Sequence, residues 1–184
     1  GVRLPARAKS AGMIPTLETE RLILRPYRLE DFDTYVEMWA DPDVVRFIGG
    51  KPFDREASWS RFLRQAGVWQ HLGFGFFAIE EKETGLMVGE AGFQDARRII
   101  EPSIEGTLEA GWGLMPTGQG WGYATEAMGA AITWAEQAFP GQRMTCIIDP
   151  DNLPSIRVAQ RLGFSELVRT SYQEKPITIF ERRK

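Results

Sequence analysis

The sequence predicts a single α/β domain in which helices cover both faces of a mixed sheet. At 184 residues the chain is long enough for one domain with a full core and short for two. Short apolar runs bounded by turn residues predict strands, and stretches with apolar residues three or four apart predict amphipathic helices. In chain order these segments give the pattern β-α-α-β-β-β-α-β-α-β-β, which is typical of helices packed on one sheet.

The first half of the chain predicts four strands and two helices. The strands are expected at residues 22–25, 74–80, 86–93 and 107–115, and the helices at residues 29–39 and 56–69. Pro26 stops the first strand, and the run Asp41-Pro42-Asp43 breaks the first helix. Residues 82–85 predict a tight turn that joins two strands in a hairpin, and the polar residues 95–106 predict an irregular connection.

The second half begins with a long helix. Apolar residues recur at helical spacing at Ala124, Ala127, Met128, Ala131, Ile132, Ala135, Ala138 and Phe139. This stripe predicts a helix with one face on the sheet, ended by Pro140-Gly141. The remaining elements are expected at residues 144–149 (a strand), 155–162 (a helix) and 165–170 with 177–181 (a closing hairpin). Pro154 suits the first turn of the short helix, and Gly163 suits its end.

Composition and charge narrow the functional class. The net charge is −3 and the basic residues are scattered, whereas nucleic-acid binding requires a basic stripe. No apolar run approaches the roughly 18 residues of a membrane span, so a cytoplasmic protein without a membrane partner is expected. Residues 1–12 have no apolar signal core. They are expected to be a flexible N-terminal arm or a cloning remnant ahead of one domain at residues 13–184.

The single cysteine and the single histidine argue against metal chemistry. Cys146 has no second cysteine for a disulfide or a thiolate cluster, and its apolar neighbours predict a buried core thiol. A nucleophilic role needs a nearby base, and the one histidine, His71, is far away in the sequence. We therefore expect no metal site and a surface position for His71.

A glycine-rich segment between a strand and a helix carries the clearest chemical signal. The predicted strand at 107–115 leads into Gly118-Gln119-Gly120-Trp121-Gly122, and the long helix begins at about Tyr123. A helix start has main-chain N–H groups without internal partners, and the helix dipole makes that end attractive to anions. Glycines allow the backbone to approach an anion closely. The segment therefore predicts a phosphate cradle, although a simple glycine-rich turn remains an alternative.

Two common nucleotide motifs do not match this segment. A Walker loop ends in Gly-Lys-Ser/Thr, and the chain has no lysine between Lys82 and Lys175. A dinucleotide fingerprint reads GxGxxG and opens the first βαβ unit, whereas this loop reads GxGxG and lies two-thirds along the chain. Nucleoside triphosphate hydrolysis is disfavoured, while a nucleotide-binding regulatory domain stays open as a third interpretation.

The run Gln119-Gly120-Trp121-Gly122-Tyr123-Ala124 fits the Gln/Arg-x-x-Gly-x-Gly/Ala signature of the GNAT superfamily of N-acetyltransferases. The chain resembles the branch of ribosomal-protein N-terminal (RimJ/RimL-type) acetyltransferases. Further segments similar to that branch are Thr19-Glu20-Arg21-Leu22-Ile23-Leu24-Arg25-Pro26, Asp41-Pro42-Asp43-Val44, Asn152-Leu153-Pro154-Ser155 and Arg161-Leu162-Gly163-Phe164. The resemblance covers residues 17–184 in the family's order. It implies a mostly antiparallel sheet that is splayed between its central strands.

The resemblance also implies acetyl-CoA as cosubstrate. The diphosphate would bind the loop amides, and the pantetheine arm would lie between the strands at 109–115 and 144–149. The implied cofactor-binding residues are Leu114, Met115, Gln119, Gly120, Trp121, Gly122, Tyr123, Ala124, Thr125, Asn152 and Ser155. A helix cap is the alternative role for Asn152.

Catalytic residues follow from the same resemblance. Glu109 is the expected base, directly or through water, because the family often places a carboxylate on the strand before the loop; the alternative is a solvated strand-end acid. A strand amide between Trp112 and Leu114 could stabilise the oxyanion. Many members protonate the leaving thiolate with a tyrosine where this chain has Ala159, so Ser155 is the substitute candidate.

The acceptor is expected to be an amine, either a protein N-terminus or a small molecule. Its pocket would be shaped by residues 44–53, 59–76 and 95–106. Six aromatic residues could line a cleft there or belong to the core: Trp39, Trp59, Trp69, Phe74, Phe76 and Phe77. An active N-acetyltransferase is the main interpretation, and a non-catalytic acyl-CoA-binding or sensing module on the same fold is the alternative that Ala159 keeps open. The protein is expected to be a monomer or a homodimer.

Overall fold

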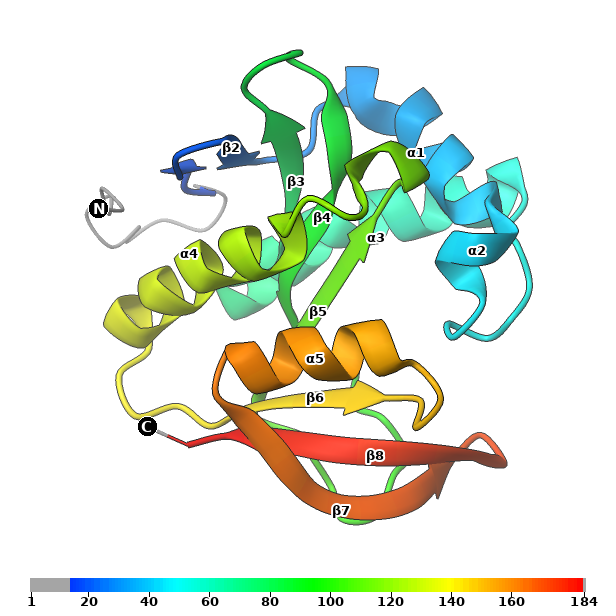
Figure 1. Cartoon of the computed structure of the whole chain (residues 1–184), viewed down its shortest axis with the longest axis vertical. Coiled ribbons are helices and arrows are strands. Elements are labelled where there is room, and N and C mark those ends of the chain that lie inside the picture. Colours follow the sequence, from blue (N-terminus) through cyan, green and yellow to red (C-terminus); the bar gives the residue numbers. More distant parts are fainter. Residues whose placement is uncertain (1–13, 184) are drawn as a thin grey trace.

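One eight-stranded sheet organises the protein, of which the computed structural model describes residues 14–183. Its strands are β1 (Leu17–Glu18), β2 (Leu22–Arg25), β3 (Phe76–Glu81), β4 (Met87–Gln94), β5 (Leu108–Leu114), β6 (Met144–Ile148), β7 (Phe164–Tyr172) and β8 (Lys175–Arg182). They lie in the order β1-β2-β3-β4-β5-β6-β8-β7 (Figure 1). Only β5 and β6 of this sheet run parallel. The expected mixed, mostly antiparallel sheet is confirmed.

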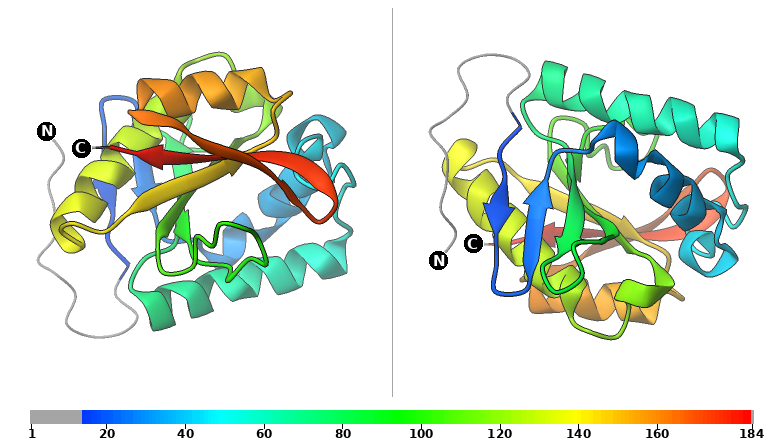
Figure 2. Two further views of the ribbon diagram at one scale, coloured as in Figure 1. Left: turned by 90° about the horizontal axis from the view of Figure 1, so that it is seen from below. Right: turned by 90° about the horizontal axis from the view of Figure 1, so that it is seen from above.

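Helices cover both faces of this sheet. They are α1 (Phe32–Ala40), α2 (Pro42–Val45), α3 (Arg55–Leu72), α4 (Tyr123–Ala138) and α5 (Leu153–Arg161), with 3-10 turns η1 (Leu29–Asp31) and η2 (Pro116–Gly118). Figure 2 shows α4 and α5 on one face and α1 and α3 on the other. Within residues 14–183, no helix combines the length and apolar character needed to cross a bilayer. The expected residues 1–12 arm lies outside the described residues.

The predicted elements are found within a few residues of their expected bounds, with two additions. The two-residue strand β1 pairs with β2, and the short helix α2 follows α1. Asp41 explains both the break and the new helix: its carboxylate accepts hydrogen bonds from the amides of Asp43 and Val44, and Pro42 fills the first helical position. The residues that end α1 therefore also start α2.

Two hydrophobic clusters fill the spaces between the sheet and its helices. The larger joins the sheet to α4 and α5 and includes Cys146 and Ala159, both buried. The smaller joins the sheet to α1 and α3. Among the aromatic residues considered for a cleft, Trp39, Trp69, Phe74, Phe76 and Phe77 are buried, whereas Trp59 is 38% exposed. These five therefore build the core. His71 is exposed in the last turn of α3, as expected.

A buried ion-pair network fastens the start of the α1 region to the sheet. The Arg25 guanidinium donates two hydrogen bonds of 2.8 Å to the Asp31 carboxylate and one of 3.0 Å to Glu80. Asp31 also accepts from the amide of Arg28 at 2.7 Å. Burial opposes ionisation of Asp31, but the bonds to Arg25 and Arg28 outweigh it and lower the pKa of Asp31. The charged pair is therefore complete at neutral pH.

Asp31→Asn should destabilise the fold strongly, because Arg25 would remain buried with too few partners for its charge. The expected loss in free energy of unfolding is about 3–5 kcal/mol at neutral pH, measured by urea denaturation. The loss should shrink in acid as the wild-type carboxyl protonates below its ordinary pKa. Asp33→Asn is the matched control, because the Asp33–Arg55 pair is exposed and should cost less than about 1 kcal/mol. Equal losses would show that the buried network is not what holds this region.

Candidate functional site

The sheet opens between its two central strands. β5 and β6 pair only at Leu108 with Met144 and at Glu109 with Thr145. β4, by contrast, pairs with β5 as far as Leu114. Beyond Glu109 the two central strands diverge, as Figure 1 shows. The expected splay is confirmed, and it leaves one edge of β5 from residue 110 to residue 114 without a strand partner.

Three glycines shape the loop that follows β5. A side-chain carbon at Gly118 would lie 2.9 Å from the carbonyl oxygen of Val88, so only glycine allows η2 to pack this closely on β4. Gly120 and Gly122 have φ angles of 82° and 79°, a left-handed conformation that favours glycine. A carbon added at Gly120 would meet nothing within 4 Å. The loop is therefore fixed at its base and open at its tip.

The loop presents a set of free main-chain donors at the start of α4. The N-cap residue Gly122 makes no side-chain cap bond. The first amide of the helix that donates to the chain is that of Glu126, to Gly122 O; within residues 14–183 the amides of residues 120–125 donate no hydrogen bond. Among the residues that the structure describes, the buried hydroxyl oxygen of Thr125 has no partner either. These donors and the helix dipole suit a diphosphate.

The N-terminal strand region holds this helix start from behind. Glu126 accepts hydrogen bonds from Thr19 Oγ1 at 2.6 Å and from the amide and Nε of Arg21 at 3.0 and 2.7 Å. The Arg21 guanidinium lies over the Tyr123 ring at 4.6 Å, and the Tyr123 hydroxyl donates to Glu81 at 2.5 Å. The segment that resembles the family's opening strand thus positions α4, a role that the sequence did not reveal.

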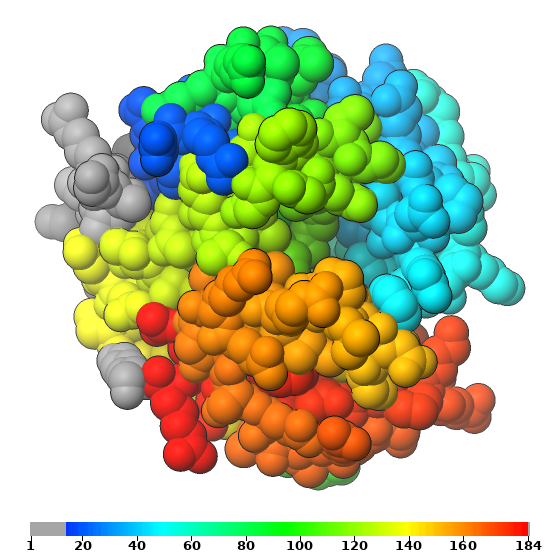
Figure 3. Space-filling view, in the orientation of Figure 1, coloured from blue at the N-terminus to red at the C-terminus, as the bar shows by residue number. Residues whose placement is uncertain are grey.

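The short helix α5 borders the same opening. Asn152 caps it, since its side-chain oxygen accepts a hydrogen bond from the amide of Ser155 at 3.3 Å. The capping alternative for Asn152 is therefore realised, and both residues are half-buried. Figure 3 shows α5 (orange) beside the start of α4 (yellow-green), with the green of β5 set back between them. Ala159 is fully buried and offers no proton.

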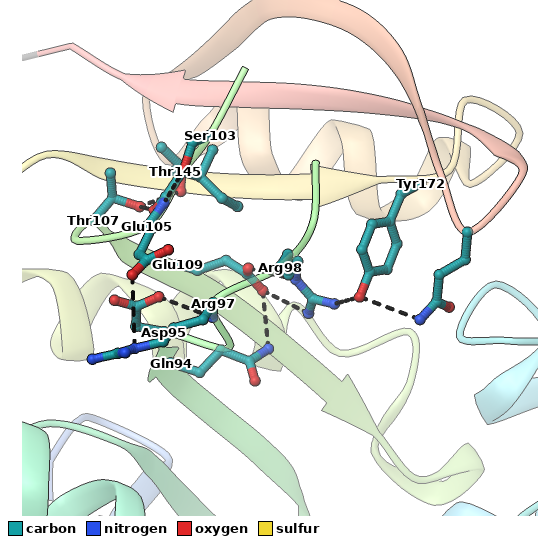
Figure 4. Close-up of polar contacts among 12 residues, drawn as sticks. Gln94, Asp95, Arg97, Arg98, Ser103, Glu105, Thr107, Glu109, Thr145 and Tyr172 are labelled. Atoms are coloured by element: carbon teal, nitrogen blue, oxygen red, sulfur yellow. Dashed lines mark hydrogen bonds and ion pairs between the residues drawn. The ribbon is translucent and has the colours of Figure 1, made fainter. Parts of the chain in front are cut away.

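Glu109 is buried and held in a polar network (Figure 4). It is 4% exposed, so it is not the solvated strand-end acid of the alternative interpretation. Arg98 donates to its two oxygens at 2.7 and 2.9 Å, and Gln94 donates at 2.9 Å. Arg98 also donates to the hydroxyl of Tyr172 at 3.2 Å and stacks on its ring. Burial lowers the pKa of Arg98, but the bonds to Glu109 outweigh it and raise that pKa.

A second buried carboxylate, Glu90, stands on β4 and was not predicted. It is 3% exposed, and one of its oxygens accepts the Tyr27 hydroxyl at 2.5 Å. Burial raises the pKa of Glu90 and outweighs the opposite effects of Arg61, Tyr27 and Arg64. The signal in the sequence was a lone acid inside the apolar strand expected at 86–93.

Other reactive groups contribute little here. Burial raises the pKa of Cys146, so its thiol stays protonated inside the core. No group of three or more His, Cys, Asp or Glu side chains within the described residues could hold a metal ion.

Comparison with known proteins identifies relatives over most of the chain. The family model described as an acetyltransferase (GNAT) domain matches residues 21–165. An uncharacterized N-acetyltransferase, p20 of Bacillus licheniformis, is 30% identical over 82% of this chain and 83% of its own. The acetyltransferase of Agrobacterium tumefaciens str. C58 is similar in structure, with a TM-score of 0.80, 28% identity and coverage of 97% of this chain and 100% of its own.

Two more distant structures share the fold. RimL, a ribosomal L7/L12 alpha-N-protein acetyltransferase solved with coenzyme A, has a TM-score of 0.72 at 16% identity, covering 89% of this chain and 94% of its own. The spermidine N-acetyltransferase of Vibrio cholerae, solved with CoA and spermine, has a TM-score of 0.70 at 12% identity, covering 89% and 95%.

Proposed function

The chain belongs to the GNAT acetyltransferase family, and from this premise we propose that it transfers the acetyl group of acetyl-CoA to a primary amine. The observation that carries the proposal is the combination of a splayed β5–β6 pair with free donors at the start of α4. One element accepts an extended thioester arm, and the other accepts its diphosphate. The two lie next to each other in the chain, because η2 joins them.

The cofactor residues proposed from the sequence fit this arrangement. The diphosphate would accept hydrogen bonds from the amides of Gly120, Trp121, Gly122, Tyr123, Ala124 and Thr125, with the free Thr125 hydroxyl as a further donor. The arm would pair with the open edge of β5 near Leu114 and Met115. Gln119 supports that edge, since its side chain donates to Leu114 O at 3.1 Å. Asn152 and Ser155 would contact the arm from α5 while keeping their cap bond.

The reaction needs a neutral amine, a stabilised oxyanion and a leaving thiolate. We propose that Glu109 accepts a proton from the attacking nitrogen through a water molecule, while Arg98 and Gln94 hold its carboxylate in place. An amide of β5 between Trp112 and Leu114 would donate to the oxyanion as the C–N bond forms. The C–S bond then breaks, and its electron pair leaves with sulfur. Ser155 is the proposed donor of a proton to that sulfur.

The acceptor is a protein N-terminus or a small-molecule amine. RimL acts on a ribosomal protein and the Vibrio enzyme on spermidine, so related folds serve both kinds of acceptor. Arg98 and Tyr172 come from two segments that meet over Glu109, and these segments would contact the acceptor.

A thiol-release assay tests the proposal. Purified protein with acetyl-CoA should release free coenzyme A in the presence of at least one member of a panel of alkylamines, polyamines, aminoglycosides and peptides with free N-termini. Coenzyme A binding measured by calorimetry accompanies the assay. Binding of coenzyme A without turnover across the panel would favour the acyl-CoA-binding module. Absence of coenzyme A binding would exclude the proposed cofactor site.

Gly122→Asp should weaken coenzyme A binding by about 10- to 100-fold, which is about 1.4–2.8 kcal/mol, because it places a carboxylate against the diphosphate. Calorimetric titration gives the affinity. Gly141→Asp is the matched control, since Gly141 has a similar φ of 77° and free space around it but lies beyond the other end of α4. If Gly122→Asp binds coenzyme A as tightly as the Gly141→Asp control, the diphosphate must bind elsewhere.

Glu109→Gln should lower turnover by about 100-fold, the usual contribution of a general base, with little change in coenzyme A affinity. Steady-state thiol release measures kcat, and calorimetry measures the affinity. Glu37→Gln, on the exposed side of α1, is the matched control and should behave as wild type. Wild-type turnover in the Glu109 variant would exclude this carboxylate from the mechanism.

A further inference from the structure

We infer that Glu90 is a second catalytic carboxylate, which takes a proton from the acceptor's ammonium group before the amine attacks. The inference rests on the proposed function, because it assigns a further residue to the same reaction. It starts from a chemical requirement. A primary amine enters mostly as an ammonium ion, since alkylamines have pKa values of about 10. Its nitrogen must lose two protons to become an amide N–H, and one carboxylate accounts for only one of them.

Strand register places the two carboxylates on one face of the sheet. Glu90 of β4 lies directly opposite Gly113 of β5, and Gln94 lies opposite Glu109. Opposed residues in an antiparallel pair point to the same side, and so do residues two or four apart on one strand. Ala78 opposes Glu90 on its other flank and belongs to the cluster under α1 and α3. Both carboxylates therefore lie on one face of the sheet, on opposite sides of Gly111, with Glu90 under α1 and α3 and Glu109 against Arg98.

Gly113 leaves space beside Glu90. A carbon added at Gly113 would meet nothing within 4 Å, whereas one added at Gly111 would lie 2.9 Å from the Phe76 ring. Opposed residues have side-chain carbons about 4.5–5.5 Å apart, so this space adjoins the Glu90 side chain. Gly113 also belongs to the part of β5 from which β6 has diverged. A nitrogen next to a thioester on that edge would come close to Glu90.

Glu90 has an oxygen available for a proton. Tyr27 binds one oxygen, and within the described residues Glu90 makes no ion pair within 4.0 Å. Glu109, by contrast, already accepts three hydrogen bonds on its two oxygens. The groups that face Glu90 are Tyr27 before α1, Tyr35 on α1, and Arg61 and Arg64 on α3. Burial raises the pKa of Glu90, which brings it closer to the neutral range where a general base works best.

Unpartnered polar atoms around Glu90 are an independent observation. Among the described residues, the Tyr35 hydroxyl and Arg61 Nε, which belong to groups that face Glu90, are buried and have no hydrogen-bond partner within 3.5 Å. Buried polar atoms in proteins are almost always satisfied, often by water. Two such atoms on side chains that face one carboxylate favour the entry of water or of a polar ligand here. That is the environment through which a proton could leave Glu90.

The protons balance in two steps. Glu90 takes one proton from the ammonium group, which leaves a neutral amine and a protonated Glu90. The amine then forms the C–N bond, its second proton passes through water to Glu109, and the C–S bond breaks with its electron pair on sulfur. The proton on Glu109 passes through water and Ser155 to sulfur, which gives free coenzyme A, and the proton on Glu90 is released to solvent. The sum is ammonium plus thioester giving amide, thiol and one proton.

Two acceptors that differ in basicity test this role. The best alkylamine of the panel is compared with its analogue carrying two fluorine atoms on the second carbon from nitrogen, whose much lower pKa leaves a large neutral fraction at neutral pH. Glu90→Gln should lower kcat/KM by about 100-fold for the alkylamine and less than about fivefold for the fluorinated analogue. Glu109→Gln should impair both acceptors. If Glu90→Gln lowers kcat/KM equally for both acceptors, or lowers it for neither, the inference is overturned. Activity of the wild-type protein would still support the proposed function.

Tyr27→Phe provides a second variant with a different readout. The Tyr27 hydrogen bond favours the ionised form of Glu90, so its removal should raise the pKa of Glu90 further. A base acts only when ionised, and the acid limb of the kcat/KM profile for the alkylamine should therefore move to higher pH. A limb that stays in place would contradict the role of Glu90. A wild-type protein that acetylates no amine would instead refute the proposed function on which the inference rests.

Discussion

The divergence of β5 from β6 is the constraint on which the site depends. A strand in the middle of a sheet normally satisfies its main-chain groups on both sides, and unpaired buried groups are costly. Here β4 satisfies one side of β5 as far as Leu114, while β6 leaves the other side after Glu109. The main-chain groups on the open edge can therefore pair with an extended ligand that carries amide groups. The pantetheine arm of coenzyme A has both properties, which is why we propose it as that partner.

The donors at the start of α4 are useful only if the helix stays in register with that edge. Two attachments from distant parts of the chain provide this register. Glu126 receives three hydrogen bonds from Thr19 and Arg21, and Gly118 packs against the Val88 carbonyl. Neither attachment uses the amides of the loop itself. The hydrogen bonds to Glu126 and the packing of Gly118 therefore fix the loop. Its main-chain donors stay free for an anion, as preorganised binding requires.

Features that depend on residues close together in the sequence were predicted correctly. Contacts between segments far apart in the sequence were not. The glycine loop, the helix boundaries and the Asn152 cap follow from residues a few positions apart, and the structure contains all three. The Glu109 network could not be predicted, because Arg98 and Tyr172 reach it from an irregular connection and a distant hairpin. Glu90 was missed for a related reason. Its strand is buried on both faces, so no alternation marks which side the acid occupies, and only the register with Gly113 shows it.

Two carboxylates on one sheet face can serve one reaction only if their surroundings differ. Glu109 is enclosed by Arg98 and Gln94, which fix its orientation and fill much of its accepting capacity, so it suits a proton delivered by water along a defined path. Glu90 has a tyrosine hydroxyl as its close partner and lies deeper under α1 and α3, where burial favours its neutral form. Phe76 fills the space over Gly111 between them. An acceptor nitrogen on the side of Gly113 would therefore give its first proton to Glu90, and its second proton would pass through water around the Phe76 ring to Glu109, which assigns a different proton to each carboxylate.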